Sequence, residues 1–418
     1  MAAVRPFKGL RPKKELADKV AALPYDVMNS EEARKMADGN PYCFLHISKA
    51  EIDLPPGTDI YDDAVYQKSK ENFNRFIKEG ILRQDTGPCF YVYRQVMPVE
   101  GGHHSQAGLV AGASVDEYQK DIILKHEQTR QDKEDDRTRN VDTLNANTGP
   151  VFLTYIAKPG IDAIIDKVME GTPENDFTSD DGIRHTFWVV SDKKIIEKIE
   201  EEFASLDHLY VADGHHRSAS ASRVRDMRMK ANPDHTGDEE YNFFLSVIFP
   251  HNQMQIMDYN RVIKDLNGLS EEEFMEKAAE KFNIEAQDIP LYKPAEKNSF
   301  GLYISGKWYR LTPKPGTFDE SDAVESLDVS ILQKNLLAPV LGINDPRTDK
   351  RIDFVGGIRG IKELVSLVDS GKFKAALALY PTSINDLIEV ADAGKFMPPK
   401  STWFEPKLRS GLAIHLLK

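Results

Sequence analysis

The chain has little cysteine, no long hydrophobic run and no excess of positive charge. Its two cysteines, Cys43 and Cys89, lie far apart without CxxC or Cys/His spacing, which argues against a zinc site or a disulfide framework. We expect both to be buried as small hydrophobic side chains. No segment approaches the roughly 20 apolar residues that span a bilayer, and residues 1–16 lack the apolar core of a signal peptide. We therefore expect a cytoplasmic protein with no membrane partner.

The balance of charge also argues against nucleic acid as a partner. Lysine and arginine total 54 against 67 aspartate and glutamate, so the net charge is -13 and a polyanion is attracted only weakly. Hydrophobic residues make up 40% and charged residues 29%, which is the balance of a globular protein. The 418 residues are enough for two or three domains.

Strand and helix signals alternate along the first part of the chain, which predicts an α/β fold of the mixed (α+β) kind. Helical patterns cover residues 161–170 and 193–204, and the turn-prone residues 100–104 join two strands into a hairpin. The strand-like runs are residues 89–96, 109–115, 151–157, 185–190, 209–212 and 243–249.

A second portion opens at Ser270, because a serine followed by three glutamates is typical of a capped helix. It continues with a hairpin at 301–312, helices near 329–337 and 358–369, and a strand at 375–380. We therefore divide the chain into residues 1–265 and 266–418. The prolines of the tail that begins at Met397 exclude a helix there, and we expect residues 397–410 to return toward the site described next.

The strongest local signal is Asp213-Gly214-His215-His216-Arg217, where a buried strand gives way to a helix of small residues. Asp213 is placed to cap the helix through its carboxylate, and Gly214 permits a tight turn. The amides of the first turn and the helix dipole favour an anion, and the two histidines with Arg217 add donors there. The pattern predicts a phosphate site. The alternatives are a purely structural turn and a metal site, although adjacent histidines seldom bind one ion.

A second polar group follows the apolar residues 122–124. Glu127 can act as a general base for a substrate hydroxyl or hold magnesium, since a carboxylate suits both tasks. His126 lies beside it, and the charged run 132–137 reads more simply as a solvated helix.

The remaining signals are weaker. Asp26 and His46 stand in the segments 24–27 and 40–46, which read as turn-plus-strand pieces. The segment 399–407 combines lysines, hydroxyls and aromatics in a proline-stiffened loop that would suit covering a small anionic ligand. The glycines of 355–360 lack GxGxxG or GxxxxGK[ST] spacing, so neither a Rossmann nor a P-loop cofactor site is indicated.

Taken together, these motifs resemble the bacterial and archaeal family called domain of unknown function 1015. The resemblance rests on 24–27, 40–46, His126-Glu127, Asp136-Arg137, 210–217 and 397–407, and so covers nearly the whole chain. The Asp-Gly-His-His-Arg element is also similar to the nucleotide-phosphate motif of the ParB/sulfiredoxin-like superfamily, which includes kinases that phosphorylate free serine with ADP or ATP. His215 stands where sulfiredoxins have a cysteine, and the helical DNA-binding domain of ParB proteins is not found in the sequence.

The resemblance implies a mixed-sheet core of the ParB/sulfiredoxin-like kind with additional N-terminal and C-terminal α/β portions. By resemblance, Asp213 to Arg217 form the phosphate motif, and together with the other residues singled out above they are expected to form the following site. The expected catalytic residues are Glu127, His126, Asp213, His216 and Arg217. The expected phosphate or nucleotide contacts are Asp213, Gly214, His215, His216, Arg217, Lys400, Ser401, Thr402 and Lys407. The expected substrate contacts are Asp26, His46 and Arg130, and the expected ligands of Mg²⁺ are Glu127 and Asp213.

The leading hypothesis is phosphoryl transfer from ATP or ADP to a small hydroxylated metabolite, with free serine the first candidate. A second hypothesis is a nucleotide-binding module or switch that transfers nothing, as a ParB-like protein would be. A third is a metal-dependent hydrolase that uses His126, Glu127, His215 and His216. The sequence leaves a homodimer open.

Overall fold

The structure is a computed structural model that describes residues 2–418, and these form two compact units. The first unit comprises the residues up to Met254 together with Pro406–Lys418, and the second comprises Gln255–Glu405. The division therefore lies before the boundary predicted at residue 265, because the strand Tyr259–Ile263 pairs within the sheet of the second unit. The segment after Glu405 returns to the first unit.

The first unit is built on a nine-stranded mixed sheet, which confirms the α/β prediction. Its order is β6-β11-β8-β12-β5-β4-β10-β9, with β1 paired to β5; β6 with β11 and β8 with β12 are parallel, and the other pairs are antiparallel. The strands of this unit are β1 Val4–Arg5, β2 Leu10–Pro12, β3 Leu82–Gln84, β4 Phe90–Val99, β5 Gly102–Ser114, β6 Ile123–Leu124, β7 Ala146–Asn147, β8 Val151–Tyr155, β9 Asn175–Thr178, β10 Arg184–Val190, β11 Leu209–Asp213, β12 Phe243–Pro250 and β21 His415–Leu416. Its helices are η1 Lys14–Leu16, α1 Ala17–Val20, η2 Tyr25–Val27, α2 Ser30–Ala37, α3 Leu45–Ser48, η3 Ala50–Asp53, α4 Asp63–Lys78, α5 Val115–Gln119, α6 Gln131–Leu144, α7 Pro159–Met169, α8 Lys193–Ala204, α9 His215–Ala231, η4 Glu240–Asn242 and η5 His251–Gln253.

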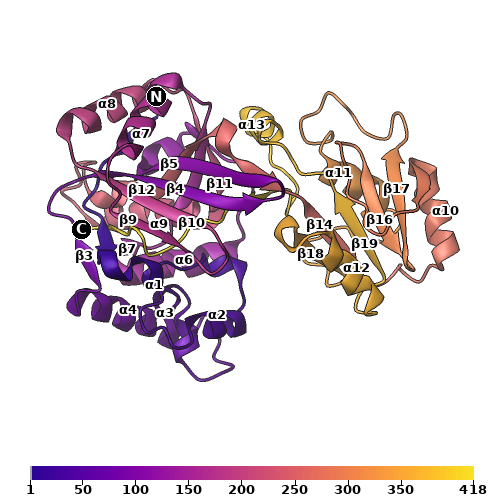
Figure 1. Ribbon diagram of the computed structural model, residues 1–418, viewed down its shortest axis with the longest axis horizontal. Coiled ribbons are helices and arrows are strands. Elements are labelled where there is room, and N and C mark those ends of the chain that lie inside the picture. Colours follow the sequence, from indigo (N-terminus) through magenta and orange to yellow (C-terminus); the bar gives the residue numbers. More distant parts are fainter. Residues whose placement is uncertain (1) are drawn as a thin grey trace. The chain divides into compact units, whose positions relative to one another are not determined.

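The main core lies between this sheet and helices α7 and α8, which cover one side of it (Figure 1). Alternate residues of β8, namely Val151, Leu153 and Tyr155, face this layer because successive strand side chains point to opposite faces. A second core gathers the N-terminal helices around Phe44, Phe73 and Phe76 and includes Ile414 of the C-terminal segment. The free cysteines Cys43 and Cys89 are both buried, as predicted.

The prediction of a strand within residues 40–46 was wrong. Tyr25–Val27 forms a 3-10 turn, and Leu45 begins the single helical turn α3, which packs on α4. Phe44 and Ile47 are both buried, and their separation of three residues places them on one face of a helical turn, a spacing that period-two reasoning overlooks.

The second unit has a six-stranded antiparallel sheet of order β15-β17-β16-β19-β14-β18 and a separate β13-β20 ribbon. Its strands are β13 Gln255–Met257, β14 Tyr259–Ile263, β15 Phe282–Gln287, β16 Phe300–Ile304, β17 Lys307–Pro313, β18 Ile352–Gly356, β19 Ala375–Leu379 and β20 Trp403–Glu405. Its helices are α10 Glu271–Lys281, α11 Asp328–Leu332, the π-helical turn η6 Gln333–Leu337, η7 Gly357–Arg359, α12 Ile361–Asp369 and α13 Ile384–Asp392. Ser270 caps α10 as predicted, since it forms a reciprocal capping box with Glu273.

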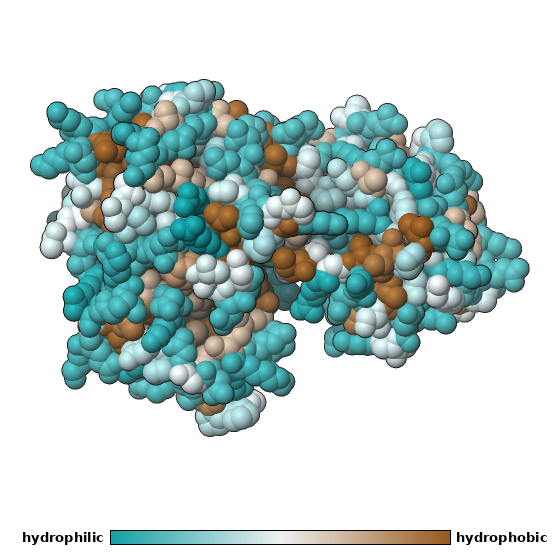
Figure 2. All heavy atoms as spheres, in the orientation of Figure 1, coloured by the Kyte–Doolittle hydropathy of each residue, from teal (hydrophilic) through white to brown (hydrophobic). Residues whose placement is uncertain are grey.

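The surface of the protein is mostly hydrophilic, as expected from a sequence without long apolar runs. Figure 2 shows a face dominated by hydrophilic residues with small separate hydrophobic patches. No helix within residues 2–418 is both long enough and apolar enough to cross a membrane.

Candidate functional site

The site is organised by the turn between β11 and α9. Strand β11 ends at Asp213 and α9 begins at His215, as the sequence predicts. Gly214 adopts φ 97°, and a Cβ atom there would lie 3.3 Å from the Arg217 side chain and 3.4 Å from Val151 Cα. Only glycine takes this conformation without strain. Arg217 N and Ser218 N both donate to Gly214 O, so the amides of His215 and His216 lie before the first amide that donates within the helix.

The prediction that the Asp213 carboxylate caps α9 was wrong. Gly214 is the capping residue, and no side chain caps the helix among the described residues. The Asp213 carboxylate instead accepts a hydrogen bond from Lys407 Nζ at 3.0 Å. Burial would raise the pKa of Asp213, but the Lys407 ammonium and then the Arg217 guanidinium outweigh it and hold the pKa well below its usual value. The structure thus brings together two residues that the sequence separates widely.

Arg217 is the cation of the first turn of α9. Its guanidinium donates to the Pro150 carbonyl oxygen and lies 3.5 Å from an Asp26 carboxylate oxygen. Burial opposes its charge, but the carboxylates of Asp26 and Asp213 raise the pKa of Arg217 above its ordinary value. Its Nε atom is buried with no hydrogen-bond partner within residues 2–418.

Arg217 lines a small cavity that is partly open to solvent. The polar part of its wall includes Tyr25, Arg137, Asn140 and Ser410. Arg137 stacks on the Tyr25 ring with its guanidinium carbon 4.0 Å from the ring centroid, and it pairs with Asp136 at 2.7 Å. Two buried guanidinium groups therefore face the same cavity.

Arg137 belongs to the Asp136-Arg137 motif of the sequence, but no role in the site was predicted for it. The interpretation of 132–137 as a solvated face correctly places these residues on a helix, α6, but the side chain of Arg137 is only 13% exposed. Arg137, Asn140, Val141 and Leu144 follow the i, i+3, i+4, i+7 spacing of a single helix face, and the last three are buried. That spacing in the sequence indicates that Arg137 shares the inward face of the helix.

A pair of buried histidines lies on another side of the same turn. Strands β6 and β11 are parallel neighbours, so residues 125–127, which follow β6, lie beside the end of β11 at Asp213. This explains how His126 contacts His215. Their rings stand edge to face with centroids 4.5 Å apart. Glu127 Oε2 lies 3.9 Å from His215 Nδ1.

Both imidazoles are held neutral. Burial lowers the pKa of His126 to about 4, against an opposing hydrogen bond to the backbone of Val211. Burial and then the neighbouring His126 lower the pKa of His215 well below its ordinary value. His126 Nδ1 and His215 Nε2 have no hydrogen-bond partner within residues 2–418.

His216 and Arg130 also lie in contact. The Arg130 amide donates to His216 Nε2 at 3.0 Å, and the Arg130 guanidinium pairs with Asp132 at 2.8 Å. Burial lowers the pKa of His216, so this nitrogen is an acceptor at neutral pH.

The other predicted contacts are engaged elsewhere. His46 binds Asp53 at 2.8 Å and the Asn40 carbonyl oxygen at 3.1 Å. Lys400, Ser401 and Thr402 belong to the second unit, where the Lys400 carbonyl accepts from Arg261. Their contacts with phosphate, and that of His46 with substrate, stay predictions.

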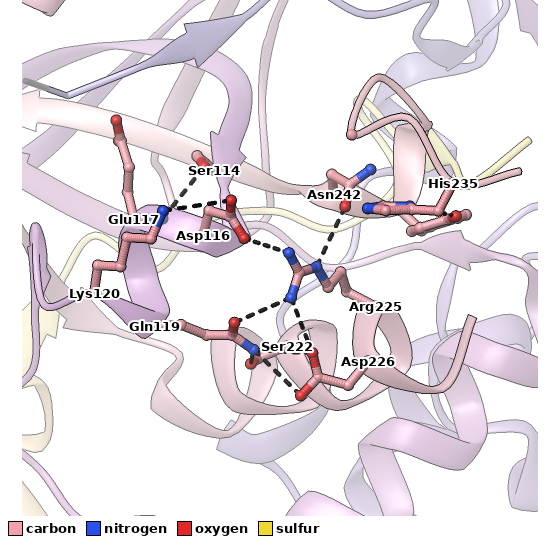
Figure 3. A network of polar contacts seen from close by, with 12 residues as sticks. Ser114, Asp116, Glu117, Gln119, Lys120, Ser222, Arg225, Asp226, His235 and Asn242 are labelled. Carbon is pink, nitrogen blue, oxygen red and sulfur yellow. Dashed lines mark hydrogen bonds and ion pairs between the residues drawn. The ribbon is translucent and has the colours of Figure 1, made fainter. Parts of the chain in front are cut away.

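Helix α9 is fixed at its middle by Arg225 (Figure 3). The guanidinium donates to Asp116 and Gln119 of α5, to Asp226, and to Asn242 of η4. Because α9 is tied to two neighbouring elements, its first turn is held in place against the sheet.

Comparison with known proteins identifies the family. The model of the family described as protein of unknown function (DUF1015) matches residues 4–330. The chain belongs to the DUF1015 family. No curated protein matches it at a significant level.

Solved structures resemble the chain only distantly. A conserved hypothetical protein from Pyrococcus furiosus has 15% identity and a TM-score of 0.37, covering 74% of this chain and 95% of its own. A free serine kinase in complex with AMP has 12% identity and a TM-score of 0.37, covering 73% and 91%. SbnI from Staphylococcus aureus, truncated at its C-terminus, has 12% identity and a TM-score of 0.36, covering 73% and 87%.

The DUF1015 match contains every site residue from Asp26 to Arg217 and ends before the segment that supplies Lys407. The arrangement offers buried cations beside a cavity, helix amides without an intrahelical acceptor, and a carboxylate next to two neutral imidazoles. The first two features suit binding of an anion such as phosphate, and the third suits proton transfer or metal binding.

Proposed function

We propose that this DUF1015 protein transfers a phosphoryl group from ATP or ADP to the hydroxyl group of a small metabolite. The first candidate acceptor is a free amino acid such as serine, which the resemblance of the Asp-Gly-His-His-Arg motif implies. The observation that carries the proposal is the pair of largely buried guanidinium groups, Arg137 and Arg217, that line one cavity at the start of α9.

The phosphate groups of the nucleotide would bind at Arg217. Asp26 is the carboxylate nearest to this guanidinium, but it sits at the long distance of 3.5 Å and its side chain is 41% exposed. It can therefore yield its place to a phosphate oxygen, which forms shorter charge-assisted hydrogen bonds with arginine. The amides of His215 and His216 and the dipole of α9 favour the same charge.

Lys407 and Asp213 have a supporting role in this proposal. Their ion pair ties the C-terminal segment to the turn before α9, and Gln95 Nε2 fixes the Lys407 carbonyl oxygen at 3.0 Å. Since catalysis of phosphoryl transfer depends mainly on positioning and charge neutralisation, a rigid turn serves the reaction directly.

In the reaction, the hydroxyl oxygen of the acceptor forms a bond to the terminal phosphorus, and the bond from that phosphorus to the nucleotide oxygen breaks. The hydroxyl proton passes to Glu127, whose carboxylate is partly exposed beside His215. Arg217 and Arg137 neutralise the charge of the transferred group and of the departing nucleotide.

Magnesium fits this site in part. Mg²⁺ prefers oxygen ligands and usually takes one or two carboxylates together with substrate phosphates. Glu127 meets that requirement, whereas Asp213 is already neutralised by Lys407. A magnesium ion held through Glu127 would supply further neutralisation of the phosphate charge.

The test is calorimetric titration of the full chain with ATP and with ADP, followed by mass spectrometry of products formed with magnesium and serine. We expect binding of at least one nucleotide and a phosphorylated product. Glu127→Gln should keep nucleotide affinity and lose turnover, while Glu320→Gln, an exposed acid of the second unit, should change neither. Absence of nucleotide binding refutes the proposal. Binding without product from any hydroxylated acceptor favours the nucleotide-binding module instead.

A further inference from the structure

Two histidine rings that pack against each other in the first unit each carry a buried nitrogen with no hydrogen-bond partner among residues 2–418. The side chains of His126 and His215 belong to residues only 2% and 4% exposed, and neither His126 Nδ1 nor His215 Nε2 has a hydrogen-bond partner within residues 2–418. A buried polar atom left unsatisfied loses its hydration without a replacement hydrogen bond, which destabilises the fold. Two such atoms, carried by rings whose centroids lie 4.5 Å apart, point to a ligand that these imidazoles bind.

The carboxylate of Glu127 completes the cluster. His126, Glu127 and His215 each offer one donor atom, and these three atoms lie within 4.8 Å of one another. The His126 ring also forms a hydrogen bond to the Val211 backbone, which orients it from behind. Such an outer partner is what fixes the tautomer and direction of a metal-binding histidine.

The donor set determines which ion would bind. Two imidazoles and one carboxylate are the protein ligands of catalytic zinc sites and of facial sites for other divalent transition metals. Magnesium and calcium instead prefer oxygen ligands throughout. We propose that His126, Glu127 and His215 form a binding site for a divalent transition metal of the zinc, manganese or cobalt class, with coordination positions left for exogenous ligands.

This site does not depend on the proposed phosphoryl transfer, because metal binding is measured without nucleotide. Glu127 belongs to both proposals, so a transition metal bound by its carboxylate would take the place of the magnesium ion considered above, while the second carboxylate oxygen stays available to the hydroxyl proton. His216 is excluded from the metal site by its own contact, because its Nε2 accepts from the Arg130 amide at 3.0 Å.

The test begins with the unaltered full chain. The protein is stripped with a chelator, mixed with Zn²⁺ or Co²⁺ in the presence of a large excess of Mg²⁺, desalted, and measured for metal content. We expect about one metal ion per chain, with X-ray absorption showing two imidazoles at about 2.0–2.1 Å from zinc. Retention of no metal, or a zinc environment without imidazole, overturns the proposal.

Variants then locate the site. His126→Asn and His215→Asn should each reduce the bound metal by at least tenfold, while His216→Asn, the adjacent residue, should retain it. His208→Asn removes an exposed histidine and controls for binding at the surface. Equal metal content in all four variants overturns the proposal. If a variant does not fold, the spectrum of the unaltered protein decides alone, because it counts the imidazoles on the metal directly.

Discussion

Acid should release the C-terminal segment through His185, a residue outside the candidate site. The ring is buried, with Nδ1 2.6 Å from the Tyr93 hydroxyl and Nε2 2.9 Å from the Ser179 hydroxyl. Arg409 donates to the same Nε2 at 3.3 Å and also binds Asp181. Protonation of His185 would place its positive charge in contact with the Arg409 guanidinium. Arg409 lies two residues after Lys407 in the C-terminal segment.

The magnitude follows from the pKa of His185. Burial and then the Arg409 guanidinium lower it from 6.5 to about 3. Because the unfolded chain binds this proton more readily, the stabilisation is complete above pH 6.5 and is lost as the pH falls toward 3. Between pH 7 and pH 5 the loss is about 2 kcal/mol, at roughly 1.4 kcal/mol for each pH unit below 6.5. That corresponds to an increase of about 30-fold in the population of the opened state.

The assay is hydrogen exchange measured by mass spectrometry on peptides that cover residues 406–418. Their amides include Ile414 N, which donates to Leu10 O at 3.0 Å. After correction for intrinsic exchange rates, the free energy of opening should fall by about 2 kcal/mol more in the unaltered protein than in His185→Gln between pH 7 and pH 5. The other buried histidines are present in both proteins and cancel. An equal decrease in both would refute the assignment of the acid sensitivity to His185.

Three further predictions concern single residues. Gly214→Ala should lower the free energy of unfolding by about 1–2 kcal/mol, because alanine is strained at φ 97°, and thermal denaturation measures this. Arg217→Lys should weaken nucleotide binding by about 10- to 100-fold in calorimetry, because a lysine cannot reproduce the guanidinium contacts; unchanged affinity would place the phosphate elsewhere. Ser270→Ala should cost the second unit about 1 kcal/mol through loss of its capping box and leave nucleotide affinity unchanged.

Local patterns were sufficient to predict most of the elements. The apolar runs of β8, β11 and β12 and the capping sequence at Ser270 each specify their element within a few residues, because side-chain period and capping act over short distances. The helix start after Asp213 was predicted for the same reason. The capping residue of α9 was not predicted correctly, because the Asp213 carboxylate is bound by Lys407, near the C-terminus of the sequence, and does not cap the helix.

The parts of the site that could not be predicted depend on pairing between distant segments. Strand β6 is only two residues long, and nothing in Ile123–Leu124 specifies that it lies beside β11. Yet that pairing is what brings His126 to His215. Arg137 reaches the cavity only because α6 packs against α9, so a charged run that looks solvated in the sequence has one buried face.

The ion pair between Asp213 and Lys407 allows the contribution of the C-terminal segment to be measured. The side chains of Asp213 and Lys407 are 31% and 12% exposed, so the pair lies between a surface pair and a buried one.

Lys407→Met keeps the aliphatic length and should destabilise the first unit by about 2 kcal/mol, because the Asp213 carboxylate loses its nearest cation. Asp213→Asn in the same chain should restore much of that loss, since no unpaired charge then remains. Lys35→Met, which breaks an exposed pair with Glu31, should have little effect on the free energy of unfolding. If Lys407→Met costs no more than this control in urea unfolding, the segment is held by its other contacts, and Lys407 has no part in holding the turn at Gly214.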